Sequence, residues 1–183
     1  MPQYKASVEP LAMREVQLLL KDLHKRPGIN SMVWLVLNSG MSLKDALSID
    51  LHDLDFASNI VKVYDYELKR KRLVMLPERT MGHISIYLDS YEKPTKRLFE
   101  ISDRGAMDTL NALSTERIGK PITWIAIRRT WAVLAFARSI AIGTMLETSG
   151  APLDSLAKWA FWEKFKNTTS TEKFMPDLLE GIV

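Results

Sequence analysis

Residues 121–159 decide the fold, and they read Pro-Ile-Thr-Trp-Ile-Ala-Ile-Arg-Arg-Thr-Trp-Ala-Val-Leu-Ala-Phe-Ala-Arg-Ser-Ile-Ala-Ile-Gly-Thr-Met-Leu-Glu-Thr-Ser-Gly-Ala-Pro-Leu-Asp-Ser-Leu-Ala-Lys-Trp. Thr123 is a suitable N-cap, so a helix is predicted to begin directly after it. Trp131 opens the longest apolar run of the chain, and we expect its side chain in the core. The stretch therefore predicts a helix that begins after Thr123 and carries core side chains.

The chain before this stretch predicts further helices and one β-hairpin. Apolar residues recur at helical spacing in four places, over residues 10–20, 30–39, 78–91 and 106–113. Asn30 is the expected cap of the second of these helices, after a stop signal at residues 26–28. Two β-type runs, 59–64 and 73–77, flank a charged tip and predict an antiparallel hairpin. The expected fold is therefore mainly α with a small antiparallel β-sheet (α+β), in a single domain over residues 1–183.

Composition narrows the classes of protein to which the chain can belong. Its 46% hydrophobic and 26% charged residues are ordinary for a soluble globular protein. No apolar run approaches the ~20 residues that a membrane span needs, and the first residues do not resemble a secretory signal. The chain has no cysteine, which excludes disulfides and thiolate metal sites, and we expect a cytoplasmic protein. Because His24, His52 and His83 are scattered, we expect no metal and no cofactor.

Residues 10–159 resemble the catalytic domain of the tyrosine recombinases, or phage integrases. In that family a His-x-x-Arg motif opens a long buried helix, and a Gly-His pair follows the next helix. Residues 125–128 fall on the first motif and Gly150-Ala151 falls on the second, without a gap between them. The resemblance implies the integrase-like fold, with a turn at Ser139 between these two helices and the second helix ending near Gly150. It extends neither to the helical tail at residues 160–183 nor to the family's separate N-terminal DNA-clamping domain, which we expect to be absent.

Most positions of the family's chemistry are changed in this chain. The resemblance implies a tyrosine that attacks a DNA phosphodiester, two arginines that hold the phosphate oxygens, and a lysine and histidines that handle protons. The five tyrosines of the chain all precede residue 92. An indole offers only an N–H donor, and isoleucine and alanine offer no proton chemistry, so we expect no catalytic residue. By this resemblance the family's first arginine falls on Ser42 and its His-x-x-Arg pair on Ile125 and Arg128. The histidine of the Gly-His pair falls on Ala151, and the nucleophilic tyrosine falls on or beside Trp159.

Arg128 is the family residue that remains, and its role has two readings. It is either a retained phosphate ligand or an arginine that pairs with a carboxylate as its helix enters the core. Trp159 and Trp162 are expected to pack against the body of the protein rather than to stack on bases. Arg128 and the adjacent Arg129 are therefore candidate DNA contacts.

The net charge of +3 is small, so it does not by itself indicate nucleic-acid binding, and the location of clustered cations matters more. They gather at the hairpin tip, and the resembled family places its hairpin against DNA. The resembled family has a catalytic lysine on this hairpin, and its position corresponds to a residue near Glu67. The sequence does not determine whether Lys69 replaces this lysine. A basic tip also keeps a β-turn soluble, but fold and charge together favour DNA contact. The expected DNA-binding residues of the tip are Lys69, Arg70, Lys71 and Arg72.

Three functions are compatible with these observations. The first is a catalytically inactive, integrase-like protein that binds double-stranded DNA, as a regulator or a recombination accessory factor. The second is an active site-specific recombinase whose nucleophile is supplied elsewhere. The third is an interaction module without DNA binding that forms homo-oligomers through its C-terminal tail, where Trp162, Phe165, Phe174, Leu178 and Leu179 supply apolar surface.

Overall fold

The computed structural model describes residues 6–65, 69–90 and 96–160. These residues form mainly helices and one small antiparallel sheet, which confirms the predicted fold class. Two 3₁₀ turns, Leu23–Lys25 and Leu51–Asp53, connect neighbouring elements. The helices and strands are α1 (Met13–Leu20), α2 (Pro27–Ser39), α3 (Leu43–Leu47), β1 (Leu54–Asp55), β2 (Ile60–Asp65), β3 (Arg70–Met75), α4 (Glu78–Asp89), α5 (Asp103–Ile118), α6 (Trp124–Ala137), α7 (Ile142–Ser149) and α8 (Leu153–Ala160).

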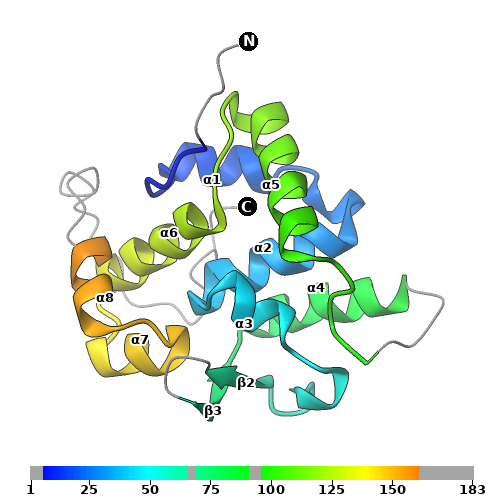
Figure 1. Ribbon diagram of the computed structural model, residues 1–183, viewed down its shortest axis with the longest axis vertical. Coiled ribbons are helices and arrows are strands. Elements are labelled where there is room, and N and C mark those ends of the chain that lie inside the picture. The colour runs from blue at the N-terminus through cyan, green and yellow to red at the C-terminus, as the bar shows by residue number, and fades with distance from the viewer. Residues whose placement is uncertain (1–5, 66–68, 91–95, 161–183) are drawn as a thin grey trace.

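Helix α2 lies at the centre of the molecule, between α4 and α6 (Figure 1). Every residue from Ile29 to Ser39 is buried, as the apolar sequence on all sides of this helix requires. The helix begins at Pro27, which corrects the expected stop at residues 26–28 and the expected cap at Asn30. Proline is favoured at the first helical position because an N–H group there has no partner within the helix. Asn30 lies inside the helix, with its Nδ2 3.0 Å from Nδ1 of His83.

Helix α6 begins where the sequence predicts. The Thr123 side chain accepts a hydrogen bond of 3.2 Å from the backbone N–H of Ala126, so Thr123 is the N-cap. Trp131 is 2% exposed, which confirms that it belongs to the core. A Cβ atom added at Gly40 would lie 2.1 Å from the Trp131 ring, and Gly40 has a φ of +64°. Glycine therefore lets the end of α2 approach α6 closely.

The sheet has the order β1-β2-β3, and each neighbouring pair is antiparallel. The hairpin is confirmed, but β3 begins at Arg70 instead of near residue 73, so strand backbone extends into the basic segment. Val61 and Val63 on β2 and Val74 on β3 are buried, while Leu73 and Met75 are 62% and 72% exposed. One face of the hairpin is thus part of the core, and the opposite face is open.

The C-terminal part of the described chain folds back beside the hairpin. Helix α7 contacts β3, and α8 contacts α6 (Figure 1). Ser139 makes the turn between α6 and α7 with a φ of +58°. Gly150 ends α7 with a φ of +62°, as the sequence indicates. Within the described residues, no helix has the length and apolar character required to cross a bilayer.

The predicted helix at residues 106–113 is the middle of the longer helix α5. This helix begins after Ser102, whose hydroxyl accepts a 3.1 Å hydrogen bond from the N–H of Gly105. Helix α4 ends at Asp89, close to the expected boundary. The expected closing segment with Trp162, Phe165, Phe174, Leu178 and Leu179 lies outside the described residues.

Candidate functional site

Arg128 lies at the point where α2, α6, α7 and α8 approach one another. Its Nε donates to the carbonyl oxygen of Gly40 at 2.6 Å, and its Nη2 donates to the carbonyl oxygen of Ser149 at 3.0 Å. Its guanidinium carbon lies 5.0 Å from the ring centroid of Trp159. One side chain therefore connects the C-terminal ends of α2 and α7 with the last residues of α8. These contacts of Arg128 use main-chain oxygens and an aromatic face.

Ser42 has a structural task at the beginning of α3. Its hydroxyl accepts a 3.1 Å hydrogen bond from the N–H of Asp45, and the Asp45 carboxylate accepts from the N–H of Ser42 at 3.3 Å. This reciprocal arrangement is a capping box, which satisfies two N–H groups at a helix N-terminus. The side chain that stands at the position of the family's first arginine is thus an N-cap.

Arg72 is buried, in contrast to its expected place at an exposed basic tip. The residue is 8% exposed, because it pairs with Val63 and points to the core face of the hairpin. Its Nη2 is 3.1 Å from Asp45 Oδ2, and its Nε is 3.7 Å from Asp65 Oδ2. Strand alternation explains the correction, since residues two apart on β3 face the same side and Val74 is buried as well.

Arg72 also satisfies carbonyl groups at the end of α7. Its Nη1 donates to Glu147 O at 3.2 Å and to Thr148 O, and its Nη2 donates to Ser149 O at 3.3 Å. The last carbonyls of a helix have no partner within the helix and carry partial negative charge, so a guanidinium is a favourable partner. Burial lowers the pKa of Arg72 below its ordinary value, while the carboxylates of Asp45 and Asp65 act in the opposite direction. Arginine remains charged despite such a shift.

Gly150 makes room for this buried ion cluster of Asp45, Asp65 and Arg72. A Cβ atom at position 150 would lie 2.8 Å from Asp65 Oδ2 and 3.0 Å from the guanidinium carbon of Arg72. The sequence analysis did not identify Asp45 or Asp65. A period-two pattern places Asp65 with Val61 and Val63 on one face of β2, but nothing in the sequence indicates that β3 supplies its cation.

The other predicted cations of the hairpin tip are exposed. Lys69, Arg70 and Lys71 are exposed, and Lys69 has a left-handed φ of +51°. Lys71 Nζ lies 3.6 Å from Asp53 Oδ1, while Arg129 is half-buried and its Nη1 donates to Val8 O at 2.9 Å. We use the name basic tip for Lys69, Arg70 and Lys71. The structure therefore separates the predicted DNA-binding residues into an exposed basic tip and arginines that donate to backbone carbonyl groups.

A cluster of possible metal ligands lies near the beginning of the sheet. Asp50, His52 and Asp53 hold possible ligand atoms within 4.8 Å of one another, but Lys96 Nζ is 3.6 Å from Asp50 and Lys71 Nζ is 3.6 Å from Asp53. These lysines already offset the negative charge that a cation would require.

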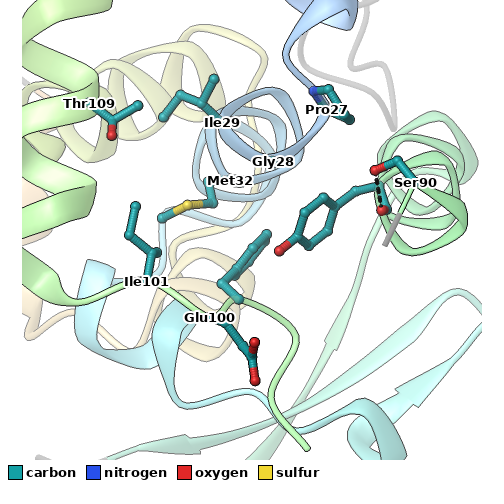
Figure 2. Close-up of a pocket in the computed structure, with 10 residues that line it drawn as sticks. Pro27, Gly28, Ile29, Met32, Ser90, Glu100, Ile101 and Thr109 are labelled. Carbon is teal, nitrogen blue, oxygen red and sulfur yellow. Dashed lines mark hydrogen bonds between the residues drawn. The ribbon is translucent and has the colours of Figure 1, made fainter. Parts of the chain in front are cut away.

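An apolar pocket lies between α2, α4 and α5. Figure 2 shows Met32 and Ile101 beside each other within this pocket and the carboxylate of Glu100 at its edge. Tyr87 and Phe99 also line it, and their rings are stacked with centroids 5.5 Å apart. This lining is suited to apolar contact. It contains none of the family positions discussed above.

Comparison with known proteins identifies the fold. No family model matches the sequence, and no curated protein is significantly similar to it. Among solved structures, XerA recombinase superposes with a TM-score of 0.73 at 18% identity, over 94% of this chain and 68% of that chain. XerH recombinase, in a post-cleavage complex with its difH substrate, superposes with a TM-score of 0.66 at 16% identity, over 85% of this chain and 50% of that chain. A λ integrase dimer bound to a core site gives 0.63 at 11% identity.

The described chain has the catalytic-domain fold of the tyrosine recombinases. The resemblance seen in the sequence is thereby confirmed at the level of the fold. Because the chain spans only 50% of the XerH chain and 52% of the λ integrase chain, the activities of those proteins are not transferred to it.

Proposed function

We propose that this protein binds duplex DNA through a tyrosine-recombinase fold and does not cleave it. The observation that carries the proposal is the use of Arg128, whose guanidinium is bonded to Gly40 O and Ser149 O and lies over Trp159. The family arginine that remains thus supports the backbone, and the resemblance puts the family's nucleophile on or beside Trp159.

The chemistry of strand cleavage argues for the inactive state. Covalent phosphoryl transfer needs an activated oxygen nucleophile and positive charge aimed at the phosphorane. No tyrosine follows Tyr91 in the sequence, and Ser42 is engaged as a helix cap. Ile125 and Ala151 have no titratable group. Since members of a catalytic constellation act as a unit, these combined changes remove the mechanism instead of slowing it.

DNA binding is supported by the basic tip. Lys69, Arg70 and Lys71 are exposed on a hairpin whose counterpart in the resembled family lies against DNA, and the net charge is +3. Cations that neutralise phosphates release condensed counterions, so affinity falls as salt rises. Phosphate contacts of this kind position a protein on DNA without specifying a sequence.

Binding of a fluorescent duplex, followed by anisotropy over a range of salt concentrations, tests the proposal. We expect binding at low ionic strength and a linear fall of log affinity with log salt. Absence of salt-sensitive binding to several duplexes would contradict the DNA-binding part. A covalent protein–DNA band would contradict the inactive part and favour an active recombinase.

A second candidate function is an interaction module without DNA binding. The observation that favours it is the open face of the hairpin, where Leu73 is 62% and Met75 is 72% exposed and Tyr64 is 40% exposed. Apolar side chains gathered on one strand face are a common feature of protein interfaces. Molar mass in solution, measured by light scattering for the chain and for Leu73→Ser with Met75→Ser, separates the two functions. The interaction module is supported if the unchanged chain self-associates, the double variant does not, and the unchanged chain does not bind duplex DNA.

A further inference from the structure

A pocket lies at the end of α2 that is opposite to Arg128. Helices α2, α4 and α5 and the residues 99–101 line this cavity of about 330 Å³, a size within the range of sites for small molecules. Pro27 and Gly28, the first residues of α2, belong to its lining, whereas Arg128 is bonded to Gly40 at the other end of this 13-residue helix. The rise of an α-helix places about 20 Å between the two ends. We call this cavity the α2–α4–α5 pocket.

The floor of the α2–α4–α5 pocket is apolar. Ile29 and Met32 on α2, Tyr87 on α4 and Phe99 before α5 line it, and all four residues are buried. Aromatic rings and a thioether sulfur make favourable contacts with another aromatic ring, because the ring faces and the polarisable sulfur both attract ring edges. The floor is therefore suited to the aromatic part of a ligand.

The aromatic wall of the pocket is held in place before any ligand binds. The Tyr87 ring is stacked on the Phe99 ring on one side. On the α2 side, a Cβ atom added at Gly28 would lie 3.3 Å from Cε2 of Tyr87, so this ring already lies close to the helix backbone. A wall that is fixed in the free protein loses little conformational entropy when a ligand binds.

The polar groups at the rim of the pocket offer acceptors to a ligand. Ser90 Oγ donates to Tyr87 O at 2.6 Å, and Thr109 Oγ1 donates to Gly105 O at 2.7 Å. A hydroxyl whose proton is used in this way offers a ligand its lone pairs. Glu100 adds an exposed carboxylate at the edge of the pocket (Figure 2), and the described residues that line the pocket include no cation.

An apolar floor with an acceptor rim suits a ligand that is aromatic at one end and cationic at the other. An ammonium group has three donors and no acceptor, so it matches rim groups that accept. An anionic group would instead be repelled by the carboxylate of Glu100. We propose that the α2–α4–α5 pocket binds a small arylalkylamine, with its ring on Tyr87 and Phe99 and its ammonium group at Glu100. This site is separate from the basic tip, and it does not require that the protein binds DNA.

A chemical-shift titration of the isotope-labelled full chain with phenethylamine tests the proposal. We expect saturable shifts of the backbone amides of residues 28–32, 87–90 and 99–101, which line or adjoin the pocket. Absence of saturable shifts, or shifts centred on other parts of the chain, would overturn the proposal. Shifts of the same amides that depend on protein concentration without any probe would show that a second copy of the chain fills the pocket, and would equally contradict it.

Two probes of similar size test the charge of the ligand. Phenethyl alcohol should bind more weakly than phenethylamine because it lacks the positive charge, and phenylacetate should bind most weakly because Glu100 repels it. The same titration measures all three affinities. Affinity for phenylacetate equal to or higher than that for phenethylamine would contradict an arylalkylamine site.

Glu100→Gln tests the residue that is assigned to the ammonium group. Its affinity for phenethylamine should fall by about two- to fivefold, the effect of an ion pair that is open to solvent, while its affinity for phenethyl alcohol should not change. The matched control is Glu147→Gln, which removes the same charge from an exposed position on α7, distant from α5 (Figure 1), and should leave both affinities unchanged. Equal affinities of the two variants for phenethylamine would overturn the proposal.

Ile101→Trp tests whether the probes occupy the cavity itself. Ile101 lies beside Met32 within the pocket (Figure 2), so a larger side chain there should fill the space and abolish binding of phenethylamine and phenethyl alcohol. The melting temperature checks that the variant folds. A folded Ile101→Trp variant that binds both probes as tightly as the unchanged chain would show that they bind elsewhere, and the proposal would be wrong.

Discussion

The guanidinium of Arg72 is surrounded by oxygen atoms from three elements. Asp45 belongs to α3, Asp65 to β2, and the carbonyls of residues 147–149 to the end of α7. Removing the Arg72 guanidinium would leave two buried carboxylates without a positive partner. The free-energy cost of such unpaired buried charges is much larger than the net contribution of the ion pair itself. This residue therefore holds the hairpin against the helices.

We expect Arg72→Ala to lower the free energy of unfolding by about 3–5 kcal/mol. The neighbouring Lys71→Ala should lower it by about 1 kcal/mol or less, because Lys71 is exposed and its ion pair with Asp53 is screened by solvent. Urea denaturation followed by circular dichroism measures both variants. Equal stability of the two variants would show that the buried ion cluster does not hold the fold together.

Alanine substitutions at three glycines distinguish the cost of a left-handed backbone from the cost of a steric clash. Gly150 combines a φ of +62° with a Cβ position 2.8 Å from Asp65, Gly119 has a φ of +75° with open space, and Gly143 lies in α7 with neither constraint. Alanine at Gly150 should therefore destabilise most, and alanine at Gly119 by about 1 kcal/mol or more. Alanine at Gly143 should be neutral or stabilise by up to about 1 kcal/mol.

Thermal unfolding of these three alanine variants checks the order. A melting temperature of Gly150→Ala at or above that of Gly119→Ala would contradict the close contact with the ion cluster.

At the scale of single residues, the sequence predicts some sites and not others. Thr123 and Trp131 could be placed because capping and burial depend on local pattern. Arg72 could not, since its partners Asp45 and Asp65 are distant along the chain and become neighbours only after folding. Strand alternation predicts that four consecutive cations point to the two sides of a strand, but it does not say which side is buried.

Among the elements, the hairpin carries the most direct prediction about function. Replacing Lys69, Arg70 and Lys71 with alanine should weaken binding to every duplex and flatten the salt slope by about two, if two of the cations contact phosphates at a slope of roughly −0.9 each. Anisotropy titrations at several salt concentrations measure the change.

The control for the basic tip replaces Lys21, Lys25 and Arg26 with alanine. These residues are also exposed, so the control removes the same net charge from the α1–α2 side of the molecule. We expect the control to retain the original slope. If both triple variants lose affinity equally, binding depends on net charge and not on the basic tip.

Element boundaries could be predicted where a residue has a strong conformational preference. Gly40 and Gly150 mark helix ends correctly, each with a positive φ. The predicted start of α2 at Asn30 was wrong because proline is common both after the end of one helix and at the first position of the next, and Pro27 is the first residue of α2. The start of β3 was mistaken because charged residues lower strand propensity, while pairing with β2 from Asp65 to Ile60 overrides it.

For the molecule as a whole, we expect no covalent bond to DNA. Incubation with a nicked suicide duplex, followed by denaturing electrophoresis, should give no protein–DNA band under conditions in which an active tyrosine recombinase does. The physical reason is that Trp159 cannot supply a nucleophilic oxygen and that Arg128 is bonded to main-chain carbonyls. A denaturant-stable band would place this chain among the active enzymes.

The capping box of Ser42 determines what a substitution at position 42 would cost. The Asp45 oxygen that accepts from the N–H of Ser42 also lies 3.1 Å from Arg72. Arginine at position 42 would cost the helix its cap, about 0.5–2 kcal/mol, and would bring another cation beside an oxygen that Arg72 already occupies. Position 42 is thus coupled to the buried ion cluster, so an arginine there would disturb the cap of α3 and the contact between Asp45 and Arg72 together.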